Sequence, residues 1–361
     1  MNAKKIIIGL FIAALTFTSC SDDEGVVFQP TTPTTETPLG AYENGVLIVN
    51  QGGWTQGNAS VSFVSNDFSV SENGVFNNVN DTPLGDVGQS IAFYNDLAYI
   101  VVNNSQKIEV VNRYTFASVS TINTGLNNPR YMAFANGKGY VTNWGDSNDA
   151  NDDFIAIIDL ASNTMTSTIA VGEGPEQILT LNNTLYITHK GGYGQNNIVS
   201  VINTTDSSVS TITVGDTPDE MVLDSSNNIW VLCEGRPSYA APETAGKLVK
   251  INTTDNTVAT TIDFQTTTDH PKVLAYESGY LYYYIDEAIY KMDETDSTLP
   301  TNSFISQALT EGDLAIHSGK LYGTRADYNT GDSEIVIYDL TTTNLIQSVD
   351  LNTGAYHIYF N

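Results

Sequence analysis

The chain has 361 residues, 41% of them hydrophobic and 15% charged, with 14 basic against 41 acidic side chains and a formal net charge of −27. This acidity excludes nucleic acid and anionic lipid headgroups as expected partners, because both would be repelled. With only two cysteines, the chain cannot be a disulfide-dense scaffold.

The N-terminus predicts export and lipidation. Lys4 and Lys5 precede an apolar run at residues 6–17 that is too short to span a bilayer, and Cys20 follows it. This pattern resembles a bacterial lipoprotein signal peptide (residues 1–19), in which cleavage leaves Cys20 as the lipidated first residue; a plain secretory signal is the alternative. The acidic residues 21–24 resemble the export signal of Bacteroidetes lipoproteins that are displayed on the outer face of the outer membrane.

We therefore expect a protein attached to the membrane through its lipid anchor only. Residues 20–42 are rich in Thr, Pro, Glu and Asp and show no hydrophobic period, so they are predicted to be a flexible tether with a reach of roughly 25 Å. Cleavage would remove two of the 14 basic residues and none of the 41 acidic ones, leaving a net charge near −29.

Residues 43–361 contain a repeat of about 46 residues, which is typical of a propeller with four-stranded blades. In the repeat at residues 129–174 we expect strands at 131–135, 139–144, 154–160 and 165–171, designated A to D from the first to the last. Six repeats begin similarly, at Gly88, Pro129, Pro175, Pro218, Pro271 and Glu311, and each carries an aromatic residue in strand B: Tyr99, Tyr140, Tyr186, Trp230, Tyr282 and Tyr322.

A seventh repeat is divided between the two ends of the chain. Residues 45–53, 59–67 and 68–76 resemble strands B, C and D, but nothing before Gly45 resembles strand A. The missing strand is found at residues 355–361. The sequence therefore predicts an all-β, seven-bladed propeller of four-stranded blades, closed by pairing of the C-terminal strand into the N-terminal blade, which removes an exposed sheet edge.

One face of this propeller is predicted to carry function. The loops from strand B to strand C vary greatly in length, as functional loops on a rigid scaffold do. Five of them contain an aromatic residue, namely Trp54, Trp144, Tyr193, Tyr239 and Tyr328, and two of these also contain an arginine, Arg236 and Arg325. Such aromatics can form a binding platform, or they can pack within their own loops.

The starts of the A strands open on the same face and should line the central channel. Their first residues form a ring of Gln89, Arg130, Glu176, Asp219, Lys272, Gly312 and Tyr356. The next ring is Ser90, Tyr131, Gln177, Glu220, Val273, Asp313 and His357. These mixed charges suit a polar ligand, or they can pair with one another around a water-filled pore. From this set Arg130, Tyr131 and His357 join the loop residues as candidate ligand-binding residues.

No catalytic or cofactor motif is present, so we expect no cofactor and a binding protein rather than an enzyme. The histidines show no metal-ligand spacing. The acidic residues 146–153 could hold calcium, but they lack the glycine and final glutamate of an EF-hand loop, so a solvated loop is the alternative. Cys233 lies in an apolar strand and is predicted to be a buried small residue.

Phrases such as KGYVTNWGDS (residues 138–147) and DFIAIIDLASNTMTSTIAVGEGPE (153–176) resemble the YVTN or YncE-like surface-layer propellers, over nearly everything after residue 43. Together with the lipoprotein signal, the chain is similar to Bacteroidetes surface propellers, which include the cobalamin-capturing BtuG group. The resemblance implies a monomeric surface protein that captures a small molecule, such as a corrinoid, for a TonB-dependent transporter. A protein-interaction or adhesion module and a metal-assisted lyase or lactonase are the alternatives.

Overall fold

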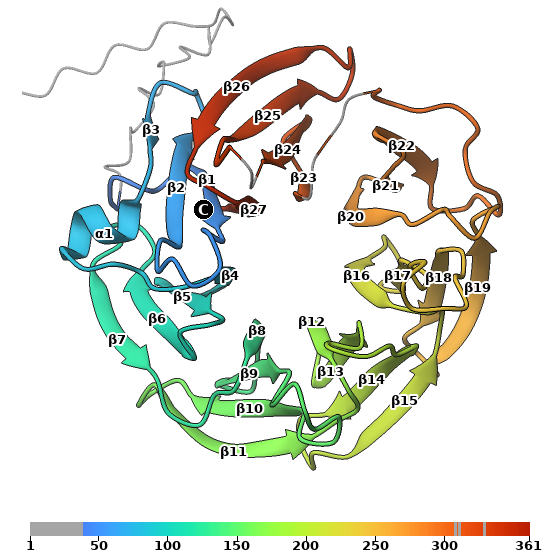
Figure 1. Cartoon of the computed structure of the whole chain (residues 1–361), viewed down its shortest axis with the longest axis horizontal. Helices are drawn as coiled ribbons and strands as arrows, with labels where there is room; N and C mark the ends of the chain where they lie inside the picture. Colours follow the sequence, from blue (N-terminus) through green and yellow to red (C-terminus); the bar gives the residue numbers. More distant parts are fainter. Residues whose placement is uncertain (1–38, 307–308, 310–311, 328–329) are drawn as a thin grey trace, which may run out of the picture. The chain divides into compact units, whose positions relative to one another are not determined.

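Seven antiparallel sheets surround a central channel in the computed structural model, which describes residues 39–306, 309, 312–327 and 330–361 (Figure 1). The seven-bladed, all-β propeller predicted from the repeat is confirmed. Each blade runs outward from an inner strand at the channel to an outer strand at the rim. No helix in the described part of the chain is long and apolar enough to cross a membrane.

The inner strands are β27, β4, β8, β12, β16, β20 and β23. The first blade combines β27 (Ala355–Phe360), β1 (Gly45–Asn50), β2 (Ser60–Ser65) and β3 (Ser71–Glu72). The second holds β4 (Gly88–Tyr94), β5 (Leu97–Val102), β6 (Lys107–Asn112) and β7 (Ser118–Ile122), and the third β8 (Pro129–Ala135), β9 (Lys138–Asn143), β10 (Phe154–Asp159) and β11 (Thr164–Ala170).

The remaining blades follow in chain order. The fourth holds β12 (Pro175–Leu181), β13 (Thr184–His189), β14 (Ile198–Asn203) and β15 (Val209–Thr213), and the fifth β16 (Pro218–Leu223), β17 (Ile229–Cys233), β18 (Lys247–Asn252) and β19 (Thr257–Asp263). The sixth holds β20 (Lys272–Glu277), β21 (Tyr280–Ile285) and β22 (Ala288–Asp293), and the seventh β23 (Leu314–His317), β24 (Lys320–Ala326), β25 (Ser333–Asp339) and β26 (Leu345–Leu351).

The ring closes as the split repeat predicts. Strand β27 pairs antiparallel with β1, with Val46 opposite Phe360 and Ile48 opposite Ile358. Beyond the strand, the amide of Asn361 donates to the backbone carbonyl of Tyr42 (2.6 Å) and to that of Arg113 (2.8 Å). The C-terminal residue is thereby fastened to two blades, and the inner edge of β1 is not left open.

Two blades differ from the regular pattern. The sixth contains three strands, and its fourth position is reduced to a single bridge between Ile289 and Ile305. In the first, the outer strand β3 has two residues and is followed by a short helix, α1 (Val75–Asn80). Val75 and Phe76 of this helix are buried, so α1 covers the apolar surface that a longer outer strand would cover.

The core lies between the blades, where the strand B aromatics pack. Tyr99, Tyr140, Tyr186, Trp230, Tyr282 and Tyr322 are all at most 2% exposed. Burying a side chain of this size stabilises the fold by roughly 1.5–3 kcal/mol. The Tyr99 hydroxyl donates to Asn163 in the next blade (3.1 Å), and that of Tyr186 to Asn256 (2.7 Å), so the polar end of these rings is satisfied across a blade boundary.

Candidate functional site

The side chains at the channel mouth are positioned by a register shift at the start of the inner strands and by hydrogen bonds between neighbouring blades. The pairing of β16 with β17 shifts register between Pro218 and Glu220, and five other inner strands carry a similar irregularity. Thr188 on β13 donates to the carbonyl of Asp219 in the next blade (2.7 Å) and accepts from the N–H of Gln177 (3.1 Å). Equivalent bonds run from Thr142 to Glu176 and from Thr324 to Tyr356.

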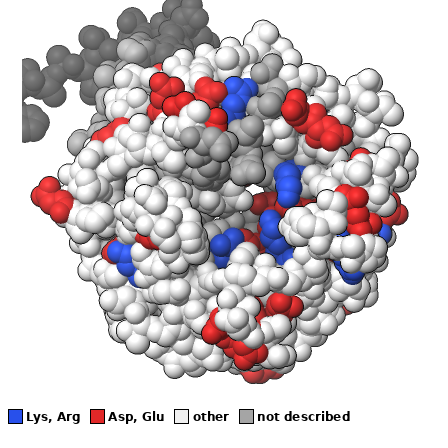
Figure 2. All heavy atoms as spheres, in the orientation of Figure 1, with Lys and Arg blue, Asp and Glu red and all other residues white. Residues whose placement is uncertain are grey.

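These bonds tie the inner strand of one blade to the second strand of the blade before it. The ring positions therefore cannot move independently of their neighbours, and their side chains are held toward the channel. Seen from this side, Lys and Arg side chains gather around the central opening of a molecule that is otherwise acidic (Figure 2).

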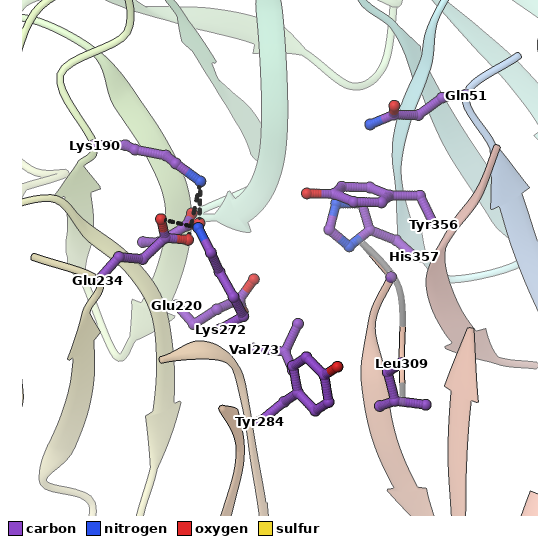
Figure 3. Close-up of a pocket in the computed structure, with 12 residues that line it drawn as sticks. Gln51, Lys190, Glu220, Glu234, Lys272, Val273, Tyr284, Leu309, Tyr356 and His357 are labelled. Carbon is purple, nitrogen blue, oxygen red and sulfur yellow. Dashed lines mark hydrogen bonds and ion pairs between the residues drawn. The ribbon is translucent and has the colours of Figure 1, made fainter. Parts of the chain in front are cut away.

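A cavity of about 450 Å³ occupies the channel mouth. It is lined by residues that directly follow a second strand or begin an inner strand, together with residues of the sixth and seventh blades: Gln51, Lys190, Asp219, Glu220, Glu234, Lys272, Val273, Tyr284, Leu309, Gly312, Tyr356 and His357. The charged groups Lys190, Glu234 and Lys272 lie together on one side, whereas Gln51 and Tyr356 lie on the opposite side (Figure 3).

The charged side of the cavity is an ion-pair chain that crosses three blades. The Lys190 ammonium contacts Asp219 and Glu234, the latter at 3.3 Å, and Lys272 contacts the other carboxylate oxygen of Glu234. Burial opposes the charge of Lys190, but the carboxylates of Asp219 and Glu234 outweigh it and raise the pKa of Lys190 well above its usual value.

The acidic residues of this wall differ in the direction in which their pKa values are shifted. Burial would raise the pKa of Asp219, but the Lys190 ammonium outweighs burial and holds that pKa below its usual value. For Glu234, burial prevails and the pKa is raised. Burial, reinforced by the charges of Asp219 and Asp313, raises the pKa of Glu220 well above its usual value. Three carboxyl groups therefore line the cavity with the two lysines, and Asp219 is the one whose ionised form is favoured.

An inner chamber of about 240 Å³ continues the channel and shares Glu220 and His357 with the mouth cavity. Here the Tyr131 hydroxyl lies 2.6 Å from Nε2 of His357, and Nδ1 of the same ring lies 3.5 Å from Oδ2 of Asp313. With Nδ1 facing the Asp313 carboxylate, the neutral ring protonated on Nδ1 would leave Nε2 to accept from the Tyr131 hydroxyl. The N–H groups of Leu314 and Ile358 donate to the Asp313 oxygens and fix them.

The structure thus brings three of the sequence-predicted residues into the channel. Tyr131 and His357 line the inner chamber. Arg130 makes a two-pronged ion pair with Glu176, from Nε at 3.1 Å and Nη2 at 2.7 Å, and lies over the Trp144 ring at 3.9 Å. Trp144 itself donates from Nε1 to the carbonyl of Pro175 (3.0 Å). Its indole packs against the starts of two inner strands rather than within its own loop.

The other predicted loop aromatics are open to solvent. Trp54, Tyr193 and Tyr239 are 65%, 56% and 87% exposed. Tyr193 contacts the Trp144 ring edge-on and hydrogen bonds through its hydroxyl with Asn128, whereas no ring contact of Trp54 or Tyr239 occurs among the described residues. Trp54 and Tyr239 therefore offer the apolar surface that a platform requires.

The predicted arginines of these loops are engaged in ion pairs. Arg236 donates to Asp216 (3.1 Å), and Arg325 donates to Glu334 (2.9 Å) and to the Tyr338 hydroxyl (3.2 Å). Neither lines the mouth cavity. Cys20 and Tyr328, the predicted lipidation site and the fifth loop aromatic, lie outside the described residues.

Several cavity residues were not among the sequence candidates. Lys190 and Glu234 directly follow β13 and β17, and Gln51 directly follows β1. Trp144 occupies the same position after β9, so a ring of residues that follow the second strands could have been aligned from the repeat. Tyr284 lies two residues after the strand B aromatic Tyr282 and could have been aligned in the same way, whereas Leu309 comes from the connection after the sixth blade, where the repeat gives no alignment.

The acidic loop at residues 146–153 is organised by its own hydrogen bonds. Asp146 accepts from the N–H of Asn148 (3.0 Å), and Asp152 accepts from the N–H of Asp146 (2.9 Å). Over the described residues, no group of three or more His, Cys, Asp or Glu side chains is placed to hold a metal ion. Cys233 is fully buried, and burial raises the pKa of its thiol to about 12.

Comparisons with known proteins agree on the fold. The family described as "Domain of unknown function (DUF5074)" matches residues 44–355, and none of the curated proteins matches the chain. A functionally unknown protein from Desulfotomaculum acetoxidans is similar in structure, with a TM-score of 0.66 and 12% identity over 88% of this chain and 98% of that one.

Two further solved structures are also similar in fold. A putative 6-phosphogluconolactonase from Bacteroides fragilis has a TM-score of 0.59 and 14% identity over 89% of this chain and 99% of that one. The dihydro-heme d1 dehydrogenase NirN, solved in complex with DHE, has a TM-score of 0.56 and 12% identity over 92% of this chain and 78% of that one. At these identities the likeness extends to the fold alone.

Proposed function

For this chain, which belongs to the DUF5074 family, we propose a capture function: it binds a small polar molecule at the channel mouth while a lipid on Cys20 holds it at the outer face of the outer membrane. The observation that carries the proposal is the cavity of about 450 Å³, a size typical of small-molecule sites, with charged groups on one wall and hydroxyl and amide groups on the other.

The exposed aromatic residues Trp54 and Tyr239 also favour ligand binding at the channel mouth. Trp54 lies in the loop that begins with Gln51, and Tyr239 in the loop that begins with Glu234, and both of those first residues line the cavity. A ligand can therefore stack a flat face on either the Trp54 or the Tyr239 ring while another part of it enters the cavity. A corrinoid, the ligand suggested by the sequence resemblance, is larger than the cavity and would lie across the mouth in this way.

Capture at a cell surface implies a recipient for the ligand. We propose a TonB-dependent outer-membrane transporter as that partner, which the resemblance to surface propellers implies. The tether at residues 20–42 would let the propeller reach the transporter without leaving the membrane.

The proposal is tested with a soluble form that begins at Ser21. We expect cyanocobalamin mixed with this protein to elute with it from a sizing column in stoichiometric amount, followed by the visible absorbance of the corrinoid. Separation of the two would refute the corrinoid proposal and favour a protein partner, to be sought by cross-linking on intact cells.

A second function, acid–base catalysis, is favoured by the inner chamber. There His357, oriented by Asp313, is a base, and Glu220, whose pKa burial raises, is an acid across the same space. In lactone hydrolysis the attacking water would displace the Tyr131 hydroxyl from Nε2 of His357 and give a proton to that nitrogen, and Glu220 would give one to the departing ring oxygen. Hydrolysis of a model lactone that His357→Asn abolishes, but that the surface variant His317→Asn leaves unchanged, would support it; no hydrolysis by the wild type would refute it.

A further inference from the structure

Cations are scarce in this protein, yet two of them line one small cavity. Of 14 basic residues in the whole chain, Lys190 and Lys272 both belong to the mouth cavity, and Arg130 lies in the ring of first residues beside it. The space-filling view shows the same clustering of basic side chains around the opening (Figure 2). This local concentration contrasts with the net charge of −27.

The two lysines keep hydrogen-bonding capacity toward the cavity. An ammonium group has three N–H donors. Lys190 directs two of them to Asp219 and Glu234, and Lys272 directs one to Glu234, with no further hydrogen-bond partner of either lysine among the described residues. One donor on Lys190 and two on Lys272 are therefore available, and the Lys272 side chain is 50% exposed.

Most of the carboxylate oxygens on this wall already accept a hydrogen bond from a neighbouring side chain. Each carboxylate oxygen of Glu234 receives a lysine N–H, and Oδ2 of Asp219 receives another. Oε2 of Glu220 accepts from the amide of Gln177. Burial also disfavours the charged forms of Glu234 and Glu220 and raises the pKa of both groups.

The opposite wall adds a neutral donor. The Tyr356 hydroxyl points across the cavity toward the lysines (Figure 3), and burial raises the pKa of this phenol, so it remains an O–H donor at neutral pH. A group that enters between these walls meets donors on both sides. An anion with several acceptor oxygens satisfies them best.

We propose that the mouth cavity binds an anionic group, a carboxylate or a phosphate, of the captured small molecule, with Lys272 and Lys190 as its cationic contacts and the Tyr356 hydroxyl opposite. This inference rests on the proposed capture function and specifies the chemistry of its ligand.

The size and charge of the protein restrict the anion to a small molecule. A nucleic acid or an anionic membrane would extend over the acidic surface and be repelled. A compact anion inside the cavity lies within a few ångströms of the lysines, below the screening length of about 8 Å at physiological ionic strength, and can accept directly from their remaining N–H donors.

The experiment measures binding of inorganic phosphate and succinate to the form that begins at Ser21, by NMR titration at constant ionic strength, with uncharged succinamide as the neutral probe. We expect saturable one-to-one binding of at least one anion and none of succinamide. Lys272→Met should weaken that binding at least about tenfold, because it removes a charged hydrogen-bond donor, whereas Lys272→Arg should retain most of it.

Lys247→Met is the matched control. Lys247 is a half-exposed lysine that is paired with Asp263 (2.6 Å) and does not line the cavity, so its loss should leave anion binding unchanged. An equal loss in Lys247→Met and Lys272→Met would show nonspecific charge attraction and refute the proposal, as would equal binding of succinamide or no saturable binding of either anion.

The two proposals can fail separately. If cyanocobalamin binds the wild type and Lys272→Met equally and neither anion binds, the anionic site is wrong and capture stands. If an anion binds through Lys272 and cyanocobalamin does not bind, the anionic site stands and the corrinoid assignment is wrong.

Discussion

His189, the residue directly before Lys190 at the end of β13, should control how the protein responds to acid. Its side chain is completely buried, Nδ1 donates to the carbonyl of Glu173 (3.1 Å) and Nε2 accepts from the Ser200 hydroxyl (2.8 Å). Burial lowers the pKa of His189 from 6.5 to about 4. The imidazole is therefore neutral in the folded protein at every pH above about 4.

A lowered histidine pKa stabilises the folded state above pH 6.5, and this contribution is lost as the pH falls toward 4, because the unfolded chain binds the proton first. Each pKa unit corresponds to about 1.4 kcal/mol, so between pH 7 and pH 4.5 His189 alone should lower the free energy of unfolding by roughly 2 to 3 kcal/mol.

The assay compares urea unfolding of the wild type and His189→Gln at both pH values. Glutamine can donate and accept as the neutral imidazole does but does not titrate, so the variant should lose about 2 to 3 kcal/mol less than the wild type on acidification, whatever its stability at pH 7. Equal losses in the two proteins would show that His189 is not a buried neutral group and would refute the reasoning.

Three other variants test the ring of inner strands by urea unfolding. Arg130→Met should destabilise the fold by about 3–5 kcal/mol, since it leaves the Glu176 carboxylate buried without its partner, and adding Glu176→Gln should recover much of this; no recovery would contradict the ion-pair explanation. Glu220→Gln should become more stable relative to the wild type as the pH rises, because a raised carboxyl pKa favours folding at low pH and this advantage is lost through the folded pKa; a constant difference would be evidence against a raised pKa. Thr188→Val should cost about 1–3 kcal/mol by leaving the Asp219 carbonyl without its donor, and an unchanged midpoint would mean that the bond between blades contributes nothing.

The fold could be predicted from the sequence because the residues that define each blade recur at regular intervals along the chain. Six strand B aromatics and six inner-strand starts recur at a nearly fixed spacing, and the incomplete first repeat requires the last residues of the chain as its inner strand. The sixth blade departs from four strands because the region after β22 provides only the bridge at Ile305. A repeat count cannot detect such a local loss.

The site was predictable only in part, because it depends on which blades face one another. Tyr131 and His357 lie in the channel, as the alignment of the inner-strand starts from the repeat predicts. Trp144 was expected on a platform, but its contacts with Arg130 and Pro175 come from the inner strands of its own and the next blade. The pairing of Lys190 with Glu234 joins equivalent positions of neighbouring blades, 44 residues apart, but the repeat does not specify which side chains pair across the boundary.

We propose that the channel mouth and its exposed aromatics together hold a small molecule. The most direct test is an equilibrium titration of cyanocobalamin with the wild type, Trp54→Ala, Tyr239→Ala and Tyr280→Ala, the last a partly exposed aromatic at the start of β21, at the opposite end of the strands. We predict that the first two substitutions weaken binding about tenfold or more and that Tyr280→Ala binds as the wild type does. Unchanged affinity in both mouth variants, or no binding by the wild type, would contradict the account.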